Sequence, residues 1–265
     1  VKMRITADQA SGFAQALFAA RADRAPIPPL TEGDPELGVD DGYAIQQELV
    51  SLLIAQGEVA SGYKLGLTSL PMQKLLGVDQ PDFSPIFSST IYPDGATLSM
   101  ENFIAPRVEA EIAVVLKEGL AGPHCTPTQV YQATAGLLAA IEIVDSRIID
   151  WQIKIADTIA DLASNGAIAL SSNLIPIDSF DPRLVGMVFT KNGHVIATGA
   201  GAAALGDPLA AVAWLANTLA PLGVTLPVGS VIMTGALHAM VPMAPGDIFR
   251  AEFAHLGPIT LRVSE

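Results

Sequence analysis

A stretch of strand length that is apolar except for one arginine and two glutamates constrains the fold of this chain most strongly. The stretch reads Arg107-Val108-Glu109-Ala110-Glu111-Ile112-Ala113-Val114-Val115-Leu116. Alternate residues of a strand share a face, so the carboxylates of Glu109 and Glu111 lie on the same face as Ala113 and Val115. That face is at least half buried, and carboxylates placed there need a cation to offset their lost hydration. A divalent metal would meet this need.

A second hydrophobic stretch, residues 137–144, contains a single acid, Glu142. Carboxylates from two strands would leave coordination positions open for water or substrate oxygens, which suits a hard cation such as Mg²⁺ or Mn²⁺. Alternatively, Glu109 and Glu111 form the solvent face of an edge strand in a half-exposed antiparallel sheet. The residues alone leave both interpretations open.

The composition excludes some classes of protein. Half of the 265 residues are hydrophobic, but no uninterrupted apolar stretch approaches the roughly 18 residues of a membrane span. The first residues lead into a helix signal without the hydrophobic region of a signal peptide, so we expect a cytoplasmic protein without a membrane partner. A formal net charge of −13 argues against nucleic acid as a partner, because phosphate binding needs clustered basic residues.

Residue counts also bear on assembly and chemistry. Charged residues make up 15% of the chain, below the roughly 25% typical of globular domains, which favours surface buried between the subunits of a homo-oligomer. Cys125 is the only cysteine, so neither an internal disulfide nor a cysteine metal cluster can form. The four histidines stand apart in the sequence, and no two of them have metal-ligand spacing.

The sequence pattern changes near residue 60. Helix signals dominate residues 1–60, whereas short β-type runs punctuated by glycine, proline and aspartate dominate residues 61–265. We therefore expect a helical N-terminal region, residues 1–60, followed by a β-rich domain, residues 61–265, that contains the candidate metal ligands.

The helical region contains recognisable start signals. Thr6 and Gln9 form a capping-box pattern, which predicts a helix that continues to about Arg24. Asp40 or Asp41 is predicted to cap a second helix.

An Asn-Gly pair at positions 192 and 193 gives the clearest local signal in the β-rich part. It separates two stretches, residues 185–190 and 194–198, and predicts a tight β-hairpin. Further helices are predicted after Thr126-Pro127 and Asp207-Pro208, and further strands over residues 231–235 and 248–253.

Lys64 lies between two glycines in Gly62-Tyr63-Lys64-Leu65-Gly66, on what should be a short strand. Glycines allow a ligand to approach the backbone closely. In a chain with 14 basic residues, a lysine near the carboxylates could transfer protons or anchor an anionic substrate. The alternative is an ordinary surface lysine on an edge strand.

A polar segment follows Glu142. It begins with Asp145-Ser146-Arg147 and continues through residues 150–161. Such a segment could supply hydrogen-bond partners to metal ligands, or it could be a solvated loop and helix face. We expect Asp145 and Arg147 to form an ion pair.

Four segments, in order along the chain, resemble the 2-keto-4-pentenoate hydratase and 4-oxalocrotonate decarboxylase family of the fumarylacetoacetase superfamily. The resemblance covers essentially the whole chain and rests most specifically on residues 62–69, 107–112, 141–147 and 199–206. It implies an α+β protein, in which a mixed β-sandwich roll of the fumarylacetoacetase C-terminal type follows a small helical N-terminal region. It also implies assembly into homo-oligomers.

The resemblance further implies the chemistry of the site. Glu109, Glu111 and Glu142 would hold Mg²⁺ or Mn²⁺, and Lys64 would be the catalytic lysine. The substrate would be a small anionic 2-oxo or 2-hydroxy acid. The expected substrate-binding residues are Ser69, Asp82, Asp157, Ser164 and Thr234.

Within the family, residues 76–83 and 150–158 are more similar to the hydratases than to the decarboxylases. The resemblance therefore implies a hydro-lyase that adds water to a 2-hydroxy-2,4-dienoate and forms a 4-hydroxy-2-oxoalkanoate. The alternatives are a 2-oxo-3-enedioate decarboxylase and a non-catalytic metal-binding homologue. A C–C hydrolase with a histidine base in its N-terminal part does not fit, because the first histidine is His124.

One position departs from the family pattern. Relatives usually read Asp-Asn-Ala-Ser where this chain has Asp161-Leu162-Ala163-Ser164. If the amide positions substrate or water in those relatives, Leu162 would alter the substrate or the rate.

Overall fold

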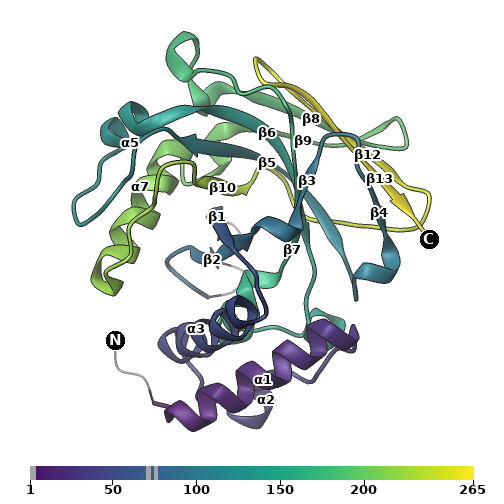
Figure 1. The fold of residues 1–265 in the computed structure, drawn as a ribbon. Coiled ribbons are helices and arrows are strands. Elements are labelled where there is room, and N and C mark those ends of the chain that lie inside the picture. The colour runs from purple at the N-terminus through teal and green to yellow at the C-terminus, as the bar shows by residue number, and fades with distance from the viewer. Residues whose placement is uncertain (1–3, 70–72, 75–76) are drawn as a thin grey trace.

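The computed structural model describes residues 4–69, 73–74 and 77–265. Leu76, the first residue of the hydratase-like segment 76–83, lies outside these ranges. Within them, two β-sheets share one hydrophobic core. Three helices lie together at one end of the molecule (Figure 1), namely α1 (Ala7–Asp23), α2 (Leu30–Gly33) and α3 (Val39–Ala55). The α+β sandwich implied by the family resemblance is confirmed.

The larger sheet is mixed. Its strand order is β2-β1-β10-β5-β6-β7-β3, and β11 also pairs with β5. β1 runs parallel to β10 and β3 runs parallel to β7, whereas β5 is antiparallel to both β10 and β6. The strands are β1 (Ala60–Gly66), β2 (Asp82–Phe87), β3 (Ile91–Pro93), β5 (Arg107–Leu116), β6 (Thr134–Val144), β7 (Asn165–Leu170), β10 (Val231–Ala236) and β11 (Val241–Pro242).

The smaller sheet has the strand order β4-β13-β12-β8-β9. The predicted hairpin is confirmed, since β8 and β9 are antiparallel neighbours joined through Asn192 and Gly193. Both turn residues have positive φ, 53° and 81°, which is the conformation that Asn-Gly pairs favour in such turns. The strands are β4 (Thr97–Ser99), β8 (Gly186–Lys191), β9 (His194–Ala200), β12 (Ile248–Phe253) and β13 (Gly257–Ser264).

Local capping chemistry explains where the helices begin. Thr6 and Gln9 form the predicted capping box at the start of α1. The second predicted helix, α3, begins earlier than expected, with Gly38 as its N-cap, and the Asp41 carboxylate accepts a hydrogen bond from the Gly38 N–H. The helices are α1 (Ala7–Asp23), α2 (Leu30–Gly33), α3 (Val39–Ala55), α5 (Pro127–Ala133), α6 (Ile155–Ala160) and α7 (Pro208–Leu219).

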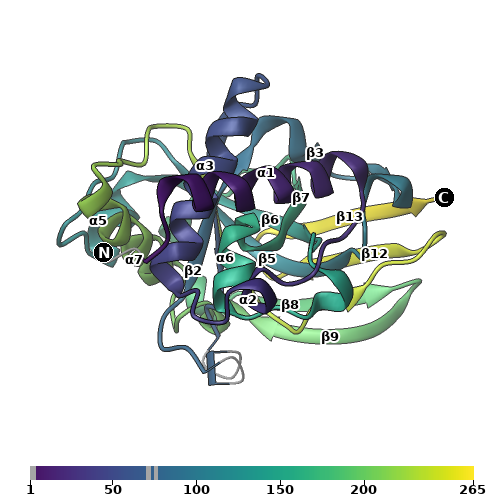
Figure 2. The ribbon, with the colours of Figure 1, turned by 90° about the horizontal axis from the view of Figure 1, so that it is seen from below.

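The N-terminal helices are packed onto the rest of the chain. Figure 2, seen from below, shows α1 and α3 in front of the strands of the larger sheet, with α6 beside them. Leu17 and Ile45 belong to the same buried cluster as Phe87, Ile148 and Leu162. The first three helices therefore share a core with the β-rich part, and a domain boundary at residue 60 stays a prediction.

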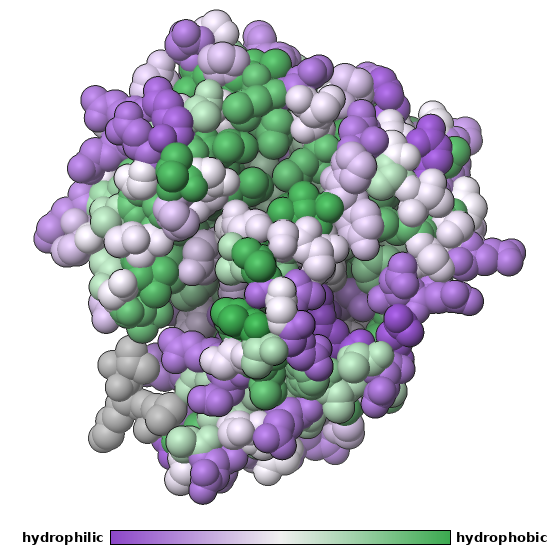
Figure 3. All heavy atoms as spheres, in the orientation of Figure 1, coloured by the Kyte–Doolittle hydropathy of each residue, from purple (hydrophilic) through white to green (hydrophobic). Residues whose placement is uncertain are grey.

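The surface combines hydrophilic rims with an apolar area. In the view of Figure 3, hydrophobic residues gather on the face above the N-terminal helices, and hydrophilic residues border them on both sides. None of the described helices is both long and apolar enough to cross a membrane.

Candidate metal and substrate site

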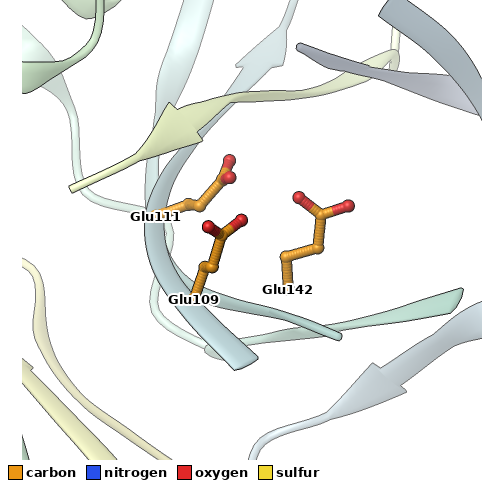
Figure 4. Close-up of side chains that lie close together, drawn as sticks. All are labelled: Glu109, Glu111 and Glu142. Carbon is orange, nitrogen blue, oxygen red and sulfur yellow. The ribbon is translucent and has the colours of Figure 1, made fainter. Parts of the chain in front are cut away.

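Three glutamates from two central strands point into a common space (Figure 4). Glu109 and Glu111 lie on β5, and Glu142 lies directly opposite Glu109 on β6. One carboxylate oxygen of each lies within 4.8 Å of the others, and the side chains of Glu111 and Glu142 are 1% exposed. The edge-strand alternative is wrong, because β5 has β10 on one side and β6 on the other.

Side chains alternate between the two faces of β5, and this alternation keeps the carboxylates out of the main core. Ala110 and Ile112 point into the hydrophobic core between the sheets, so Glu109 and Glu111 must point away from it. Oε2 of Glu111 accepts a hydrogen bond from the N–H of Gly235 at 2.9 Å. Oε1 of Glu111 is buried and has no hydrogen-bond partner among the described residues.

The crowded carboxylates make the cluster electrostatically unfavourable on its own. Burial, followed by the nearby charge of Glu142, raises the pKa of Glu109 to about 8. The same two causes raise the pKa of Glu111 well above its ordinary value. Like charges in a site of low dielectric disfavour one another, so the cluster requires either protons or a cation.

Lys64 supplies positive charge beside the cluster. It lies on β1, between β2 and β10, and its side chain is 3% exposed, so the surface-lysine alternative is wrong. Its Nζ is 2.7 Å from Glu142 Oε1 and donates to the carbonyl oxygen of Ala163 at 2.7 Å. Burial works to lower the pKa of Lys64, but the carboxylates of Glu142 and Asp82 outweigh it, and the pKa is raised.

Asp82 reaches the same space from β2. It is paired with Gly66 of β1, where an added Cβ would lie 2.1 Å from Asp82 Oδ1, so this approach requires a glycine. Oδ1 is buried and meets no donor of suitable geometry among the described residues. Burial raises the pKa of Asp82 to about 6, against the opposing effect of Lys64.

These groups open onto a cavity of about 430 Å³. The three glutamates, Lys64 and Asp82 form its charged end. Ser69, Thr158 and Ser164 add hydroxyl groups to the wall. The rest of the wall is mainly apolar and includes Leu65, Leu67, Val144, Trp151, Ile153, Leu237 and Met240.

Two of the expected substrate-binding residues lie elsewhere. The Asp157 carboxylate accepts hydrogen bonds from the N–H and the hydroxyl of Thr31 and from the N–H of Lys154. The Thr234 hydroxyl donates to the carbonyl of Ile112 within the sheet. Neither residue is among the described residues that line the cavity, and their contact with substrate stays a prediction.

His238 and Trp151 line the cavity and were missed as site residues by sequence reasoning. Nε2 of His238 accepts from the Ala110 N–H at 2.9 Å, and its Nδ1 lies 2.7 Å from the carbonyl oxygen of Ala239. This arrangement assigns the proton to Nδ1, and burial lowers the pKa of His238. A neutral ring with both nitrogens engaged supports the wall rather than serving as a base.

Trp151 is held in place at the wall by a hydrogen bond and by a cation–π contact. Its Nε1 donates to the carbonyl of Ala105, and the Arg107 guanidinium lies 4.5 Å from the ring centroid. The sequence signal that could have identified Trp151 is the presence of an aromatic residue inside the polar segment after Glu142.

Leu162 lies behind the site. Its side chain is 1% exposed and belongs to the cluster formed with the N-terminal helices, and it is absent from the described cavity wall. The departure from the family pattern therefore changes packing next to the site and adds no apolar group to the cavity.

Comparisons with known proteins show what this chain is similar to. A family model described as fumarylacetoacetate (FAA) hydrolase C-terminal matches residues 65–264. The chain is 42% identical over 255 residues to the 2-keto-4-pentenoate hydratase of Paraburkholderia xenovorans (strain LB400), which covers 96% of this chain and 95% of that protein. It is 41% identical over 253 residues to the 2-hydroxyhexa-2,4-dienoate hydratase of Comamonas testosteroni, which covers 95% and 96%.

One solved structure is similar over its whole length. The 4-oxalocrotonate decarboxylase from Pseudomonas putida G7, complexed with magnesium and adipate, superposes with a TM-score of 0.96 at 34% sequence identity. The superposition covers 99% of this chain and 100% of that chain.

Proposed function

This chain belongs to the fumarylacetoacetate hydrolase family, and from that membership we propose that it is a metal-dependent hydro-lyase. It adds water to a 2-hydroxy-2,4-dienoate and forms a 4-hydroxy-2-oxoalkanoate. The observation that carries the proposal is the meeting of three glutamate carboxylates with the buried Lys64 at one cavity. The hydratases at 41 and 42% identity support this reaction over other chemistry of the family.

The carboxylate cluster fits a divalent cation. It offers hard oxygen donors from Glu109, Glu111 and Glu142, and one of these oxygens, Glu111 Oε1, is buried without a partner among the described residues. We assign these three residues as ligands of Mg²⁺ or Mn²⁺, and the magnesium complex of the related decarboxylase supports the choice. When bound, such a cation acts as a Lewis acid towards the oxygens of a 2-oxo acid.

Lys64 is assigned to proton transfer and to binding an anionic oxygen. Its ammonium group lies between Glu142 and the carbonyl of Ala163 at the charged end of the cavity. Because its pKa is raised, the group is charged at neutral pH and begins the cycle as a proton donor. Protonation of the dienol at C5, with loss of the enol proton, gives the conjugated 2-oxo-3-enoate.

Asp82 is assigned as the base for the second step. A pKa of about 6 and an unpaired, buried oxygen at the cavity suit a group that accepts a proton from water near neutral pH. The water oxygen then adds to C4, and a proton returned to C3 completes the 4-hydroxy-2-oxo acid. The hydroxyls of Ser69 and Ser164 at the wall are assigned to hydrogen bonds with substrate oxygens.

The test is a direct assay of purified protein with freshly generated 2-hydroxypenta-2,4-dienoate. Loss of dienol ultraviolet absorbance is followed with Mg²⁺ and with a chelator, and the products are analysed for 4-hydroxy-2-oxopentanoate and CO₂. The proposal expects rapid, metal-dependent formation of the hydroxyketo acid, and expects Lys64→Met to abolish most of the turnover. Metal binding without turnover of the dienoate would instead indicate a non-catalytic homologue.

A 2-oxo-3-enedioate decarboxylase is the second candidate, because the solved structure with a TM-score of 0.96 has that activity. Its type of substrate carries a second carboxylate, which needs a counter-charge when it is buried. Among the described residues of the cavity wall, Lys64 is the one lysine or arginine, and it is already paired with Glu142. The wall therefore favours the hydratase, and release of CO₂ from 4-oxalocrotonate would favour the decarboxylase.

We also propose a homo-oligomer. The low fraction of charged residues and the hydrophobic face in Figure 3 both support buried surface between subunits. Light scattering on a size-exclusion column measures the mass of the assembly, and a monomer would contradict the proposal. The cytoplasmic location expected from the sequence stays a prediction.

A further inference from the structure

The segment that follows α6 adopts an unusual backbone conformation next to the site. Leu162, Ala163 and Ser164 have φ values of 55°, 48° and 55°. The left-handed region is unfavourable for residues with a Cβ, and consecutive residues persist there only when their surroundings hold them.

Arg147 holds both ends of this left-handed turn. Its Nη2 donates to the carbonyl of Asp161 at 2.7 Å, and its Nη1 donates to the carbonyl of Asn165 at 3.0 Å. Its Nε pairs with the Asp161 carboxylate, which also accepts the backbone N–H of Arg147 at 2.9 Å. The guanidinium thus spans the residues immediately before and after the turn.

This contact differs from the ion pair expected from the sequence. Asp145 does not pair with Arg147, because its carboxylate accepts the backbone N–H groups of Ile104 and Ala105. Arg147 and Asp161 are instead both buried, at 2% and 1% exposure. A buried arginine fork can bind two carbonyls and a carboxylate in fixed directions, which a lysine ammonium is unable to reproduce.

The turn contacts the Lys64 ammonium through the carbonyl oxygen of Ala163. The carbonyl oxygen of Ala163, in the middle of the turn, accepts the 2.7 Å hydrogen bond from Lys64 Nζ. Among the described residues, that ammonium also pairs with the carboxylate of Glu142. The direction of the Lys64 side chain is therefore set by one carboxylate of the cluster and by a carbonyl whose position depends on the turn.

We propose that Arg147 is a positioning residue for Lys64. By bridging Asp161 and Asn165, it holds the left-handed turn in place and so fixes the carbonyl that orients the ammonium for proton transfer. The inference rests on the proposed role of Lys64. The competing explanation is that Arg147 and Asp161 form a buried ion pair that contributes to stability alone.

The experiment compares Arg147→Lys, Arg147→Met and a matched control, Arg21→Met. Arg21 of α1 donates to the same Asn165 carbonyl at 3.2 Å. Among the described residues it forms neither a hydrogen bond nor a close ion pair with Asp161, whose charge acts on Arg21 from a longer distance. Each protein is assayed for kcat, KM, Mn²⁺ affinity and Tm at saturating metal, beside the wild type and Lys64→Met. A crystal structure of Arg147→Lys is also determined.

If the proposal is right, the changes in kcat do not follow the changes in Tm across the variants. Arg147→Lys keeps a cation opposite Asp161 and retains most of the Tm, but its kcat falls by about 10- to 100-fold because the lysine is unable to span the turn. Its KM and Mn²⁺ affinity change by less than about threefold, since the glutamates are untouched. Arg21→Met loses Tm yet keeps kcat within about twofold. In the crystal, the Ala163 carbonyl moves away from Lys64 Nζ.

The proposal is overturned if kcat follows Tm across the variants, or if Arg147→Lys retains wild-type kcat with the Ala163 contact intact. Should Arg147→Met fail to fold, Arg147→Lys alone decides the matter. Failure of the proposed function is recognised separately, because the wild type would then not convert the dienoate. In that case the crystal structure still tests whether Arg147 fixes the carbonyl.

Discussion

At the scale of single residues, the carboxylate cluster depends on positive charge. Lys64 offers one cation and lies against Glu142. Glu111 receives one backbone N–H on Oε2, while its Oε1 is buried without a partner among the described residues. Glutamates in such positions destabilise the fold when no metal is present and stabilise it when a metal is bound.

Glu111→Gln should therefore raise the Tm when no metal is present and lower it when metal is bound. In a chelator, the variant should have a higher Tm than the wild type, because it removes one buried like charge. With Mg²⁺ at about a hundred times its Kd, bound metal adds about 2.7 kcal/mol to the wild type, which should then be the more stable. Thermal melts in both buffers check this, with the exposed Glu252→Gln as control. The same order of Tm in both buffers would contradict the role of Glu111.

Leu162→Asn restores the residue that relatives usually have and should still destabilise this protein. Asparagine tolerates the left-handed conformation better, a gain of at most about 1 kcal/mol. The buried amide loses the apolar contacts of Leu162 and lacks an evident partner, a loss of about 2 to 3 kcal/mol. Urea unfolding should show the net loss, and kcat should stay within about twofold because the side chain lies off the cavity wall. A large change in kcat at unchanged stability would contradict this assignment.

At the scale of elements, Asp41 ties the start of α3 to the segment before α1. Its Oδ1 accepts the backbone N–H groups of Arg4 and Ile5, and its Oδ2 accepts that of Gly38. Burial works to raise the pKa of Asp41, but these hydrogen bonds outweigh it and lower the pKa. A carboxylate with a lowered folded pKa stabilises the fold fully above its unfolded pKa, about 4, and loses that effect as the pH falls through the folded pKa.

Asp41→Asn should therefore destabilise the protein in a pH-dependent way. The amide can replace one accepting oxygen but not both, so the free energy of unfolding at pH 7 should fall by about 1 kcal/mol. The difference from the wild type should shrink as the pH falls below about 4. Urea titrations from pH 7 to the acid limit of the fold measure it, with the exposed Asp178→Asn as control. A difference that is constant with pH would show that the charge of Asp41 contributes nothing.

At the scale of the whole molecule, the cavity has a charged end and an apolar remainder. The charged end is built from β1, β2, β5 and β6, whereas Trp151, Leu237 and Met240 come from segments far apart in the chain. This division suits a substrate whose carboxylate and 2-oxygen lie at the glutamates and whose tail is uncharged.

The protein should therefore prefer 2-hydroxypenta-2,4-dienoate to a dienoate with a terminal carboxylate. A second carboxylate placed among apolar side chains without a counter-charge should lower kcat/KM by at least about 100-fold. Steady-state kinetics with both substrates measure the ratio. Equal kcat/KM values would mean that a cation outside the described wall, such as Arg107, whose guanidinium lies over the Trp151 ring, reaches the tail.

Features that arise from neighbouring residues could be predicted from the sequence. The period of two in β5 placed Glu109 and Glu111 on one face, the Asn-Gly pair placed the β8–β9 hairpin, and the Thr6 capping box placed α1. These features depend on backbone geometry and local hydrogen bonds, which a short segment carries wherever it lies in the fold.

Contacts between groups that are distant in the sequence could not be predicted in this way, because they depend on how the whole chain folds. Arg147 pairs with Asp161 rather than with Asp145. The Asp157 carboxylate accepts a hydrogen bond from the hydroxyl of Thr31, and the hydroxyl of Thr234 donates a hydrogen bond within the sheet. Each choice depends on sheet order and on helices that pack from the other end of the chain. A side chain interacts with whichever donor or charge the fold brings within hydrogen-bond distance. Two residues can be this close in space however far apart they are in the sequence.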